Sequence, residues 1–536
     1  MKTNFTILLI FLSTLFCWAN NLTDSDKNSY FVKFTDKNGT IYSIDKPEEF
    51  LSDKSIERRR KLQIAIDSTD LPLSQIYVDS IISYGAAIQH QIKWQNGVIA
   101  DMTTDVATQI ETLGFVDMVE ITKIVSYDAQ NVISSTLKSD ATSAVSFEDT
   151  EAQKIQIGLD QLHDLGFRGE GITIAVIDAG YENADEMAVF DSIRHNGQLL
   201  GTYDFADPTS NIYDEDYHGT YVLSTMAAND PNLMIGTAPD ANYYLLRTEI
   251  AATEWLIEID LFCRALEWAD SAGVDVVNTS LGYSQFDYSG MDFTYDDLDG
   301  KTIRASVSSA MAVEKGIFLV NSAGNEGNSS WHYIASPADA EGVLTVGGVD
   351  SQGYASYFSS YGPTADGRIK PEVVARASAC AVVFTSNYVI SANGTSFSAP
   401  VVAGMVASLM SALPDITPAE LYTKICASAS LYSTPSDNLG YGIPNAMNVY
   451  SSLSSVVDNI TKENYIYITQ DSNRIQLHNI SDNAFVKIYD IKGAVIYADY
   501  IGNEQYINVS GWNSGIYIIQ IADHKNLFNS KFVITN

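Results

Sequence analysis

The pattern of apolar and polar positions changes twice along the chain. Residues 29–125 alternate short apolar strands with amphipathic helices, and their order predicts a small βαββαβ unit of the ferredoxin-like α+β type. Between residues 151 and 452, continuous apolar strands alternate with helices. From residue 458 onward, short strands separated by Gly and Asn turns predict a small all-β sandwich. The chain therefore divides into three folding units.

The central unit has strands that are apolar along their whole length. The run Gly171–Ile177 is typical of a parallel strand buried on both faces. Apolar residues from Trp255 to Ala269 follow helical spacing, Gly273 is placed to end that helix, and Val274–Val277 forms the next strand. The pattern predicts an α/β fold with a mostly parallel sheet and helices on both faces.

Two segments are candidate sites of proteolytic cleavage. Residues 126–150 are rich in Ser, Thr, Asp and Ala and predict an exposed linker that is open to cleavage. The basic run Arg58-Arg59-Arg60-Lys61 could be a second processing site, but it lies inside the helical pattern Ser52–Lys61. A solvated helix face is therefore the favoured interpretation of that run.

The first nineteen residues resemble an export signal. Lys2 is followed by the apolar run Ile7–Phe11 and by small residues at Cys17 and Ala19. This order predicts a secretory signal peptide, residues 1–19, cleaved after Ala19. The apolar stretch is shorter than the ~20 residues that a membrane-spanning helix needs.

Composition and charge narrow the class of protein. Of the 536 residues, 46% are hydrophobic and 18% are charged, which excludes a disordered chain. The net charge is −35, and most of the acidic excess lies between residues 151 and 456. Such a charge disfavours nucleic acid and acidic membranes as partners. After the signal, Cys263, Cys380 and Cys426 allow one disulfide at most.

Three segments of the central unit carry residues suited to nucleophilic catalysis. Asp178 ends an apolar strand, at the edge where α/β folds place their sites, and His218 and Ser396 each open an apolar helix. Alone, Asp178 could be a turn former or helix cap, and His218 a capping residue. Together they supply what a serine nucleophile needs, because an imidazole must take its proton and a carboxylate must orient that imidazole.

The ordered motifs Asp178-Ala179-Gly180, His218-Gly219-Thr220 and Gly394-Thr395-Ser396-Phe397-Ser398-Ala399-Pro400 resemble those of the subtilisin-like serine proteases, in which the triad runs Asp, His, Ser. The resemblance covers the central unit, residues 151–455. It implies that Asp178 stabilises the imidazolium, that His218 acts as general base and then general acid, and that Ser396 attacks the carbonyl.

The resemblance also supplies an oxyanion residue. Asn325, within Asn321–Gly327, matches the family's oxyanion asparagine. Its amide and the Ser396 backbone N–H would hydrogen-bond the tetrahedral intermediate. The alternative is a turn asparagine after a strand.

A strand edge is the expected binding place for substrate. The residues Ser280, Leu281 and Gly282 follow a predicted strand and resemble the family's substrate-pairing edge, with Gly324 as the facing wall. Main-chain pairing of this kind accepts extended peptides with little regard to sequence. The expected partners are therefore protein and peptide substrates.

No cofactor is expected, and no metal site is predicted. The loop Phe286–Gly300 carries five aspartates, and many relatives bind structural calcium at other loops. This loop matches no EF-hand pattern, so a solvated acidic loop is the favoured interpretation.

The flanking units gain roles from the same resemblance. Residues 28–125 resemble the family's propeptide, which implies an intramolecular inhibitor held until the 126–150 linker is cut. Residues 458–536, with Val486–Gly493 and Ser514–Tyr517, resemble the sorting domains of Bacteroidota type IX secretion, although the chain ends without their usual basic residue. We therefore expect a zymogen that is secreted or held at the cell surface, is monomeric, and has the type IX machinery as a partner.

Three other interpretations fit the sequence less well. An esterase needs Gly two residues after the serine, where this chain has Ser398, and its chain order differs. A sedolisin-type peptidase would have Glu in place of His218. A binding protein on an inactivated protease scaffold should have lost a triad member or the oxyanion residue, and all four are present. The sequence predicts an active serine endopeptidase.

Overall fold

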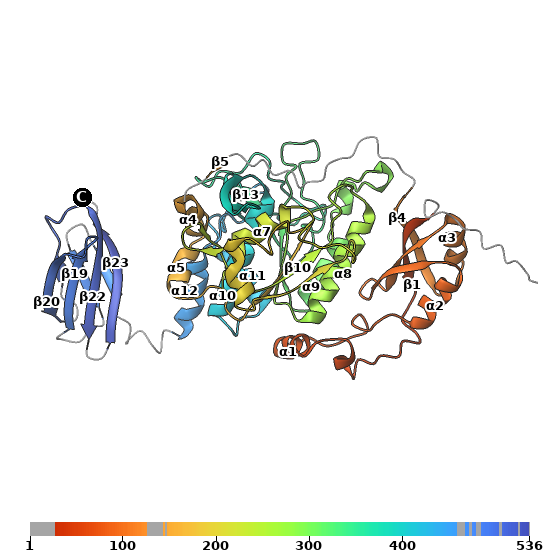
Figure 1. The fold of residues 1–536 in the computed structure, drawn as a ribbon, viewed down its shortest axis with the longest axis horizontal. Coiled ribbons are helices and arrows are strands. Elements are labelled where there is room, and N and C mark those ends of the chain that lie inside the picture. Colours follow the sequence, from red (N-terminus) through yellow and green to blue (C-terminus); the bar gives the residue numbers. More distant parts are fainter. Residues whose placement is uncertain are drawn as a thin grey trace, which may run out of the picture. The chain divides into compact units, whose positions relative to one another are not determined.

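The computed structural model describes residues 27–125, 143–144, 147–457, 467–470, 474–478, 484–502, 506–523 and 526–534. These form two compact units that divide between Tyr450 and Ser451 (Figure 1). The predicted signal peptide lies outside the described residues. So does most of the predicted 126–150 linker, of which residues 143–144 and 147–150 are described.

An antiparallel four-stranded sheet in the order β2-β3-β1-β4 opens the first unit. Its strands are β1 (Asn28–Phe34), β2 (Ala87–Ile92), β3 (Gly97–Met102) and β4 (Val116–Lys123). The crossover helices are α2 (Gln75–Ser83) and α3 (Thr104–Glu111). This is the predicted ferredoxin-like arrangement.

Helix α1 (Asp53–Leu62), which the sequence predicted over Ser52–Lys61, lies in the connection between β1 and α2 and is additional to the ferredoxin-like arrangement. Helix α2 was not predicted. Helix α1 begins at Ser52, whose hydroxyl accepts a hydrogen bond from the Ser55 N–H. The prediction of a solvated face for the basic run is wrong for its first half. Arg58 and Arg59 are buried, whereas the Arg60 side chain is 75% exposed and pairs with Glu57 of the same helix.

A seven-stranded sheet forms the centre of the first unit, in the order β14-β13-β12-β11-β6-β10-β7, and every pairing is parallel. Its strands are β6 (Thr173–Asp178), β7 (Leu199–Asp204), β10 (Asn242–Arg247), β11 (Val276–Thr279), β12 (Phe318–Ser322), β13 (Leu344–Val349) and β14 (Val373–Arg376). All six residues of β6 are buried, as the continuous apolar run predicted.

Helices pack on both faces of this sheet (Figure 1). They include α7 (His218–Ala227), α8 (Leu256–Ala272), α9 (Arg304–Glu314) and α10 (Thr395–Ala412). Ala175 and Ile177 of β6 share one core cluster with Ile259 and Phe262 of α8, while the alternate residue Val176 is buried outside that cluster. Because side chains alternate across a strand, both faces of the sheet are covered. The predicted α/β fold is confirmed.

The second unit is an all-β domain, as predicted. Its described strands form the sheets β17-β18-β21 and β20-β19-β22-β23. They are β17 (Tyr467–Gln470), β18 (Arg474–His478), β19 (Ala484–Asp490), β20 (Val495–Ile501), β21 (Tyr506–Asn508), β22 (Gly515–Asp523) and β23 (Asn526–Ile534). Buried residues of both sheets, among them Leu477 and Ile519, meet in one core.

Helix α10 is long and apolar enough to cross a membrane, but most of its residues are buried in the first unit, where it contacts the central sheet. The packing requires glycine at Gly404. A Cβ there would lie 1.9 Å from Thr237 Oγ1 and 2.9 Å from the Thr237 backbone carbon. Gly404 therefore lets the backbone segment at Thr237 contact the helix directly.

Replacing Gly404 with alanine is expected to destabilise the first unit by ~1–3 kcal/mol, because overpacking forces the backbone near Thr237 to move. Urea unfolding of the purified chain measures this change. The matched control is Gly114→Ala, whose added Cβ would meet nothing within 4 Å. Equal unfolding midpoints for the two variants would contradict the packing argument.

Candidate active site

A buried hydrogen bond joins the ends of two elements at the carboxyl edge of the sheet. Asp178 is the last residue of β6, and His218 is the first residue of α7. The His218 Nδ1 lies 2.7 Å from Asp178 Oδ1, and this oxygen also accepts a 2.8 Å bond from the Ala179 N–H. Both side chains are 1% exposed. The carboxylate therefore fixes the imidazole in one orientation.

This contact depends on a glycine. A Cβ on Gly219 would lie 2.3 Å from the Gly180 carbonyl oxygen and 3.0 Å from Asp178 Cβ. The backbone of His218 is held as well, because its N–H donates to Asp216 Oδ1 at 2.8 Å. The sequence His-Gly thus allows α7 to begin directly against the end of β6.

The surroundings of His218 act on its pKa in opposite directions. Desolvation lowers the pKa, whereas the Asp178 carboxylate raises it through its charge and its hydrogen bond. The net pKa lies above the usual 6.5. An imidazole that gains a proton here is stabilised by its neighbour, which is the property required of a general base.

Ser396 lies in the first turn of α10, and the residue that follows it packs near this histidine. The ring of the next residue, Phe397, is 5.8 Å from the His218 ring, centroid to centroid. In this structure the Ser396 hydroxyl donates to the Ser280 carbonyl oxygen at 3.4 Å. Ser396 is buried to 5% exposure, at the positive end of an eighteen-residue helix.

Asn325 is oriented by the same helix end. Its Oδ1 accepts from the Thr395 N–H at 2.9 Å and lies 3.0 Å from Thr395 Oγ1. With the oxygen engaged there, the amide nitrogen lies on the side of Gly394, where an added Cβ would be 3.8 Å from Nδ2. The Gly324 N–H, in turn, donates to Thr395 Oγ1 at 3.1 Å.

The segment after β11 completes the group. The Ser280 hydroxyl donates to the Ser396 carbonyl oxygen at 2.9 Å, and the Asn321 amide donates to the Leu281 carbonyl oxygen at 3.3 Å. These contacts connect Ser280–Gly282 to the first turn of α10. The structure therefore brings all eight residues singled out in the sequence into one region.

A cluster of buried carboxyl groups beside this region was missed by the sequence analysis. Oxygens of Glu249, Glu254 and Glu258 lie within 4.8 Å of one another, and Glu249 Oε1 accepts from the Tyr283 hydroxyl at 2.8 Å. Tyr283 directly follows the Ser280–Gly282 edge. Desolvation raises the pKa of Glu249 to about 7 and raises the pKa values of Glu254 and Glu258 well above 4.5, which favours the protonated form of these carboxyl groups.

The acidic loop after this edge also differs in part from its prediction. Asp287 is buried, its carboxylate accepts from the Glu254 N–H at 3.2 Å, and its own N–H donates to the Glu254 carbonyl oxygen. Asp299, as predicted, lies in an exposed turn, where it accepts from backbone N–H groups. In the sequence of this loop, acidic and aromatic residues alternate, and that pattern does not indicate which aspartate is buried.

Comparison with known proteins decides the family. The family model for the subtilase family, peptidase S8, matches residues 169–442, more than half of the chain. The chain belongs to the subtilase family. Two further family models match its flanks: the Bacteroidota peptidase S8 propeptide domain at residues 29–138 and the secretion-system C-terminal sorting domain at residues 462–535.

Curated relatives agree with this assignment. The chain is 28% identical over 281 residues to the thermostable alkaline protease of Halalkalibacterium halodurans, covering 52% of this subtilase and 68% of the relative. It is 28% identical over 288 residues to subtilisin DY of Bacillus licheniformis, covering 52% and 93%. This subtilase is a serine-type endopeptidase made with a propeptide, and its sorting domain places it outside the cell or on its surface.

The fold of the subtilase is also found among solved structures. Fervidolysin from Fervidobacterium pennivorans, described as a keratinolytic enzyme related to subtilisin, aligns with a TM-score of 0.54 over 95% of this chain and 76% of its own. The sequences are 16% identical, so this likeness bears on the fold alone.

Replacing Asp178 with asparagine is expected to lower the pKa of His218 below 6.5, because the desolvation remains and the opposing charge is removed. The ring-proton NMR shift of His218, followed against pH, measures the change. His163 serves as an internal reference, since burial lowers its pKa to about 4 in a different part of the unit. An unchanged His218 titration would show that Asp178 does not control it.

Proposed function

We propose that this chain is a secreted endopeptidase that hydrolyses peptide bonds through Asp178, His218 and Ser396, with Asn325 in the oxyanion hole. The observation that carries the proposal is the buried 2.7 Å contact between His218 and Asp178, adjacent to the first turn of the helix that carries Ser396. The pairing supplies the base that a serine nucleophile lacks.

In the proposed acylation step, the Ser396 hydroxyl turns from the Ser280 carbonyl to the His218 imidazole. His218 takes the proton as Oγ attacks the peptide carbonyl carbon, and then gives that proton to the leaving amine. Asp178 stays ionised and stabilises the imidazolium. Water repeats the sequence to release the acyl group, with His218 again as base.

The oxyanion formed on the carbonyl oxygen needs donors that are already in place. The Asn325 amide is positioned by the two contacts of its Oδ1 with Thr395. The Ser396 N–H lies in the first turn of α10, where helix N–H groups point outward without internal partners. Fixed donors stabilise the developing charge without reorganising, which favours the transition state over the substrate.

Substrate would bind in an extended conformation along Ser280, Leu281 and Gly282, with Gly324 on the facing side. The segment follows β11 and is held to Ser396 and Asn321 by hydrogen bonds, so the edge and the nucleophile keep a fixed separation. Backbone pairing with such an edge places the scissile bond while leaving specificity to side-chain pockets.

The proposal includes a processing scheme. Residues 1–19 would be removed as a signal peptide, residues 28–125 would act as propeptide and intramolecular inhibitor, and cleavage within 126–150 would release the catalytic domain, 151–455. Residues 458–536 would engage the type IX secretion machinery. The family models on both flanks support this order. The mature enzyme would act as a monomer.

Replacing Ser396 with alanine is expected to abolish casein hydrolysis and maturation through the 126–150 linker, because the other two hydroxyls in the first turn of α10 are already engaged. The Thr395 hydroxyl binds Asn325 Oδ1, and the Ser398 hydroxyl donates to the Thr395 carbonyl oxygen. Casein turnover and the intact mass of the secreted chain measure the two effects. Equal activity and equal processing in wild type and variant would refute the assignment.

Replacing Asn325 with alanine is expected to reduce kcat by about 10²–10³ with little change in KM, because the lost donor acts on the transition state. Steady-state kinetics on a peptide amide separate the two constants. The control is Asn328→Ala, three residues along the same loop and exposed. A loss confined to KM, or an equal loss in the control, would remove Asn325 from the oxyanion hole.

A further inference from the structure

The additional helix α1 lies against the C-terminal ends of α8 and α9, and glycine allows this approach. Gly273 follows α8 and Gly316 follows α9, with φ of 83° and 90°. A Cβ on Gly273 would lie 2.7 Å from Lys54 Cβ, and one on Gly316 would lie 2.6 Å from Leu62 Cδ1. The backbone of α1 at Ser55 thus lies against the end of α8, and the side chain of Leu62 lies against the end of α9.

Arg58 of α1 satisfies backbone carbonyl groups at these ends. Its guanidinium donates to the carbonyl oxygens of Val274 at 2.5 Å, Asp270 at 3.2 Å and Lys315 at 3.3 Å. The last carbonyls of a helix have no internal partners and carry the negative end of its dipole. A cation at this position is therefore favourable for both helices at once.

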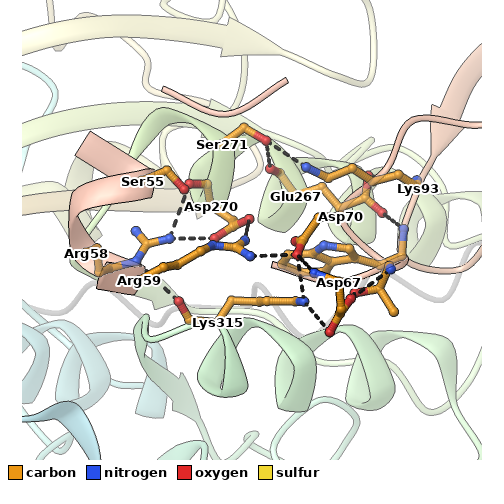
Figure 2. Close-up of polar contacts among 12 residues, drawn as sticks. Ser55, Arg58, Arg59, Asp67, Asp70, Lys93, Glu267, Asp270, Ser271 and Lys315 are labelled. Atoms are coloured by element: carbon orange, nitrogen blue, oxygen red, sulfur yellow. Dashed lines mark hydrogen bonds and ion pairs between the residues drawn. The ribbon is translucent and has the colours of Figure 1, made fainter. Parts of the chain in front are cut away.

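A buried set of alternating charges continues from Arg58 (Figure 2). Both oxygens of Asp270, which is fully buried, are taken by α1: Oδ1 by Arg58 at 2.5 Å and Oδ2 by Arg59 at 2.6 Å. Arg59 also binds Asp70 at 2.8 Å, and Lys315 lies 3.2 Å from the same Asp70 oxygen. Each charged group in the set lies next to a group of opposite charge. Arg58, Arg59 and Asp70 belong to the connection that carries α1, and Asp270 and Lys315 belong to the ends of α8 and α9.

The β1–β4 sheet makes a second, neighbouring contact with α8, and the two meet at Ser271, which accepts from the Ser52 N–H and from Lys93 Nζ. The sheet reaches α8 one turn earlier, where the Glu267 carboxylate accepts from the N–H groups of Lys93 at 2.9 Å and Trp94 at 2.6 Å. The connection that carries α1 spans residues 35–74, which is long for a link between a strand and a helix of one small domain. This connection has secondary structure of its own, and its helix α1 is held against α8 and α9 by the contacts above.

We propose that Arg58, Arg59 and Asp70, together with Asp270 and Lys315, form a charge clamp that holds the propeptide on the catalytic domain after the linker is cut. If the two arginines were replaced, the bound state would hold Asp270 buried without a counter-charge, which is strongly unfavourable and would favour release of α1. Activation then requires the charge clamp to open as well as the linker to be cleaved. The inference rests on the proposed role of residues 28–125 as a removable propeptide.

The test uses the full chain with Ser396→Ala and a recognition site for a sequence-specific protease placed within residues 126–142. Cleavage there does not depend on the chain's own activity. Native mass spectrometry after cleavage then follows dissociation of the propeptide fragment. The nicked parent is expected to stay associated, and Arg58→Met with Arg59→Met is expected to dissociate at least tenfold faster, since methionine keeps the apolar stem but removes the charge.

The matched control is Arg60→Met, on the same helix, where the side chain is exposed and pairs with Glu57. It is expected to dissociate at the rate of the parent. Equal rates in the Arg58→Met/Arg59→Met variant and in this control would overturn the charge clamp, as would immediate dissociation of the nicked parent.

A measurement on the nicked parent itself covers the case in which the double variant does not fold. Hydrogen exchange at the amides of α1 is expected to be slow while the fragment stays bound. Fast exchange of α1 with continued protection of β1–β4 would show that the sheet alone holds the propeptide, and would overturn the proposal. Failure of the triad assignment would show in casein hydrolysis and would leave these rates unchanged.

Discussion

The geometry of the site depends on how the carboxylate of Asp178 is buried. A strand covered on both faces ends in this residue, and an ionised group in such surroundings is unfavourable unless hydrogen bonds satisfy it. The Ala179 N–H and the His218 imidazole both reach the same oxygen. The imidazole can do so only if α7 begins against the strand end, which Gly219 permits. The position of the base thus follows from the burial of the acid.

Helix α8 connects the two regions of the catalytic unit where charge is most deeply buried. Its seventeen residues span roughly 25 Å at 1.5 Å per residue. Glu258 in its first turn lies among carboxyl groups beside the substrate edge, and burial raises their pKa values. Asp270 in its last turn is neutralised by two arginines of α1. The first arrangement belongs wholly to the catalytic unit, whereas the second lasts only as long as α1 remains bound.

The sequence predicted what local patterns encode. The strands of the parallel sheet were predicted from apolar runs. The site residues were predicted from a family resemblance carried by short motifs, each of which spans only a few consecutive residues. The burial of Arg58 and Arg59 was not predictable, since their partner Asp270 is more than two hundred positions away and a basic run inside a helix is usually solvated. Helix α2 was not predicted, although the shorter helix α3 was; the single helix predicted between β1 and β2 was α1. The cluster around Glu258 was missed for the same reason as the arginines: each glutamate alone looks like a surface residue.

The acidic composition also bears on how the proenzyme assembles. Most of the chain's negative excess lies in the region that α1 contacts, while α1 itself presents Lys54, Arg58 and Arg59 to acceptors there. Charges attract over about a Debye length, ~8–10 Å at ordinary ionic strength, before any contact is desolvated. The propeptide as a whole is not basic, so the positive charge that faces the catalytic unit here is concentrated on α1. In the final contacts, carbonyl and carboxylate oxygens at the ends of α8 and α9 replace the water around Arg58 and Arg59. The two side chains then form specific hydrogen bonds there.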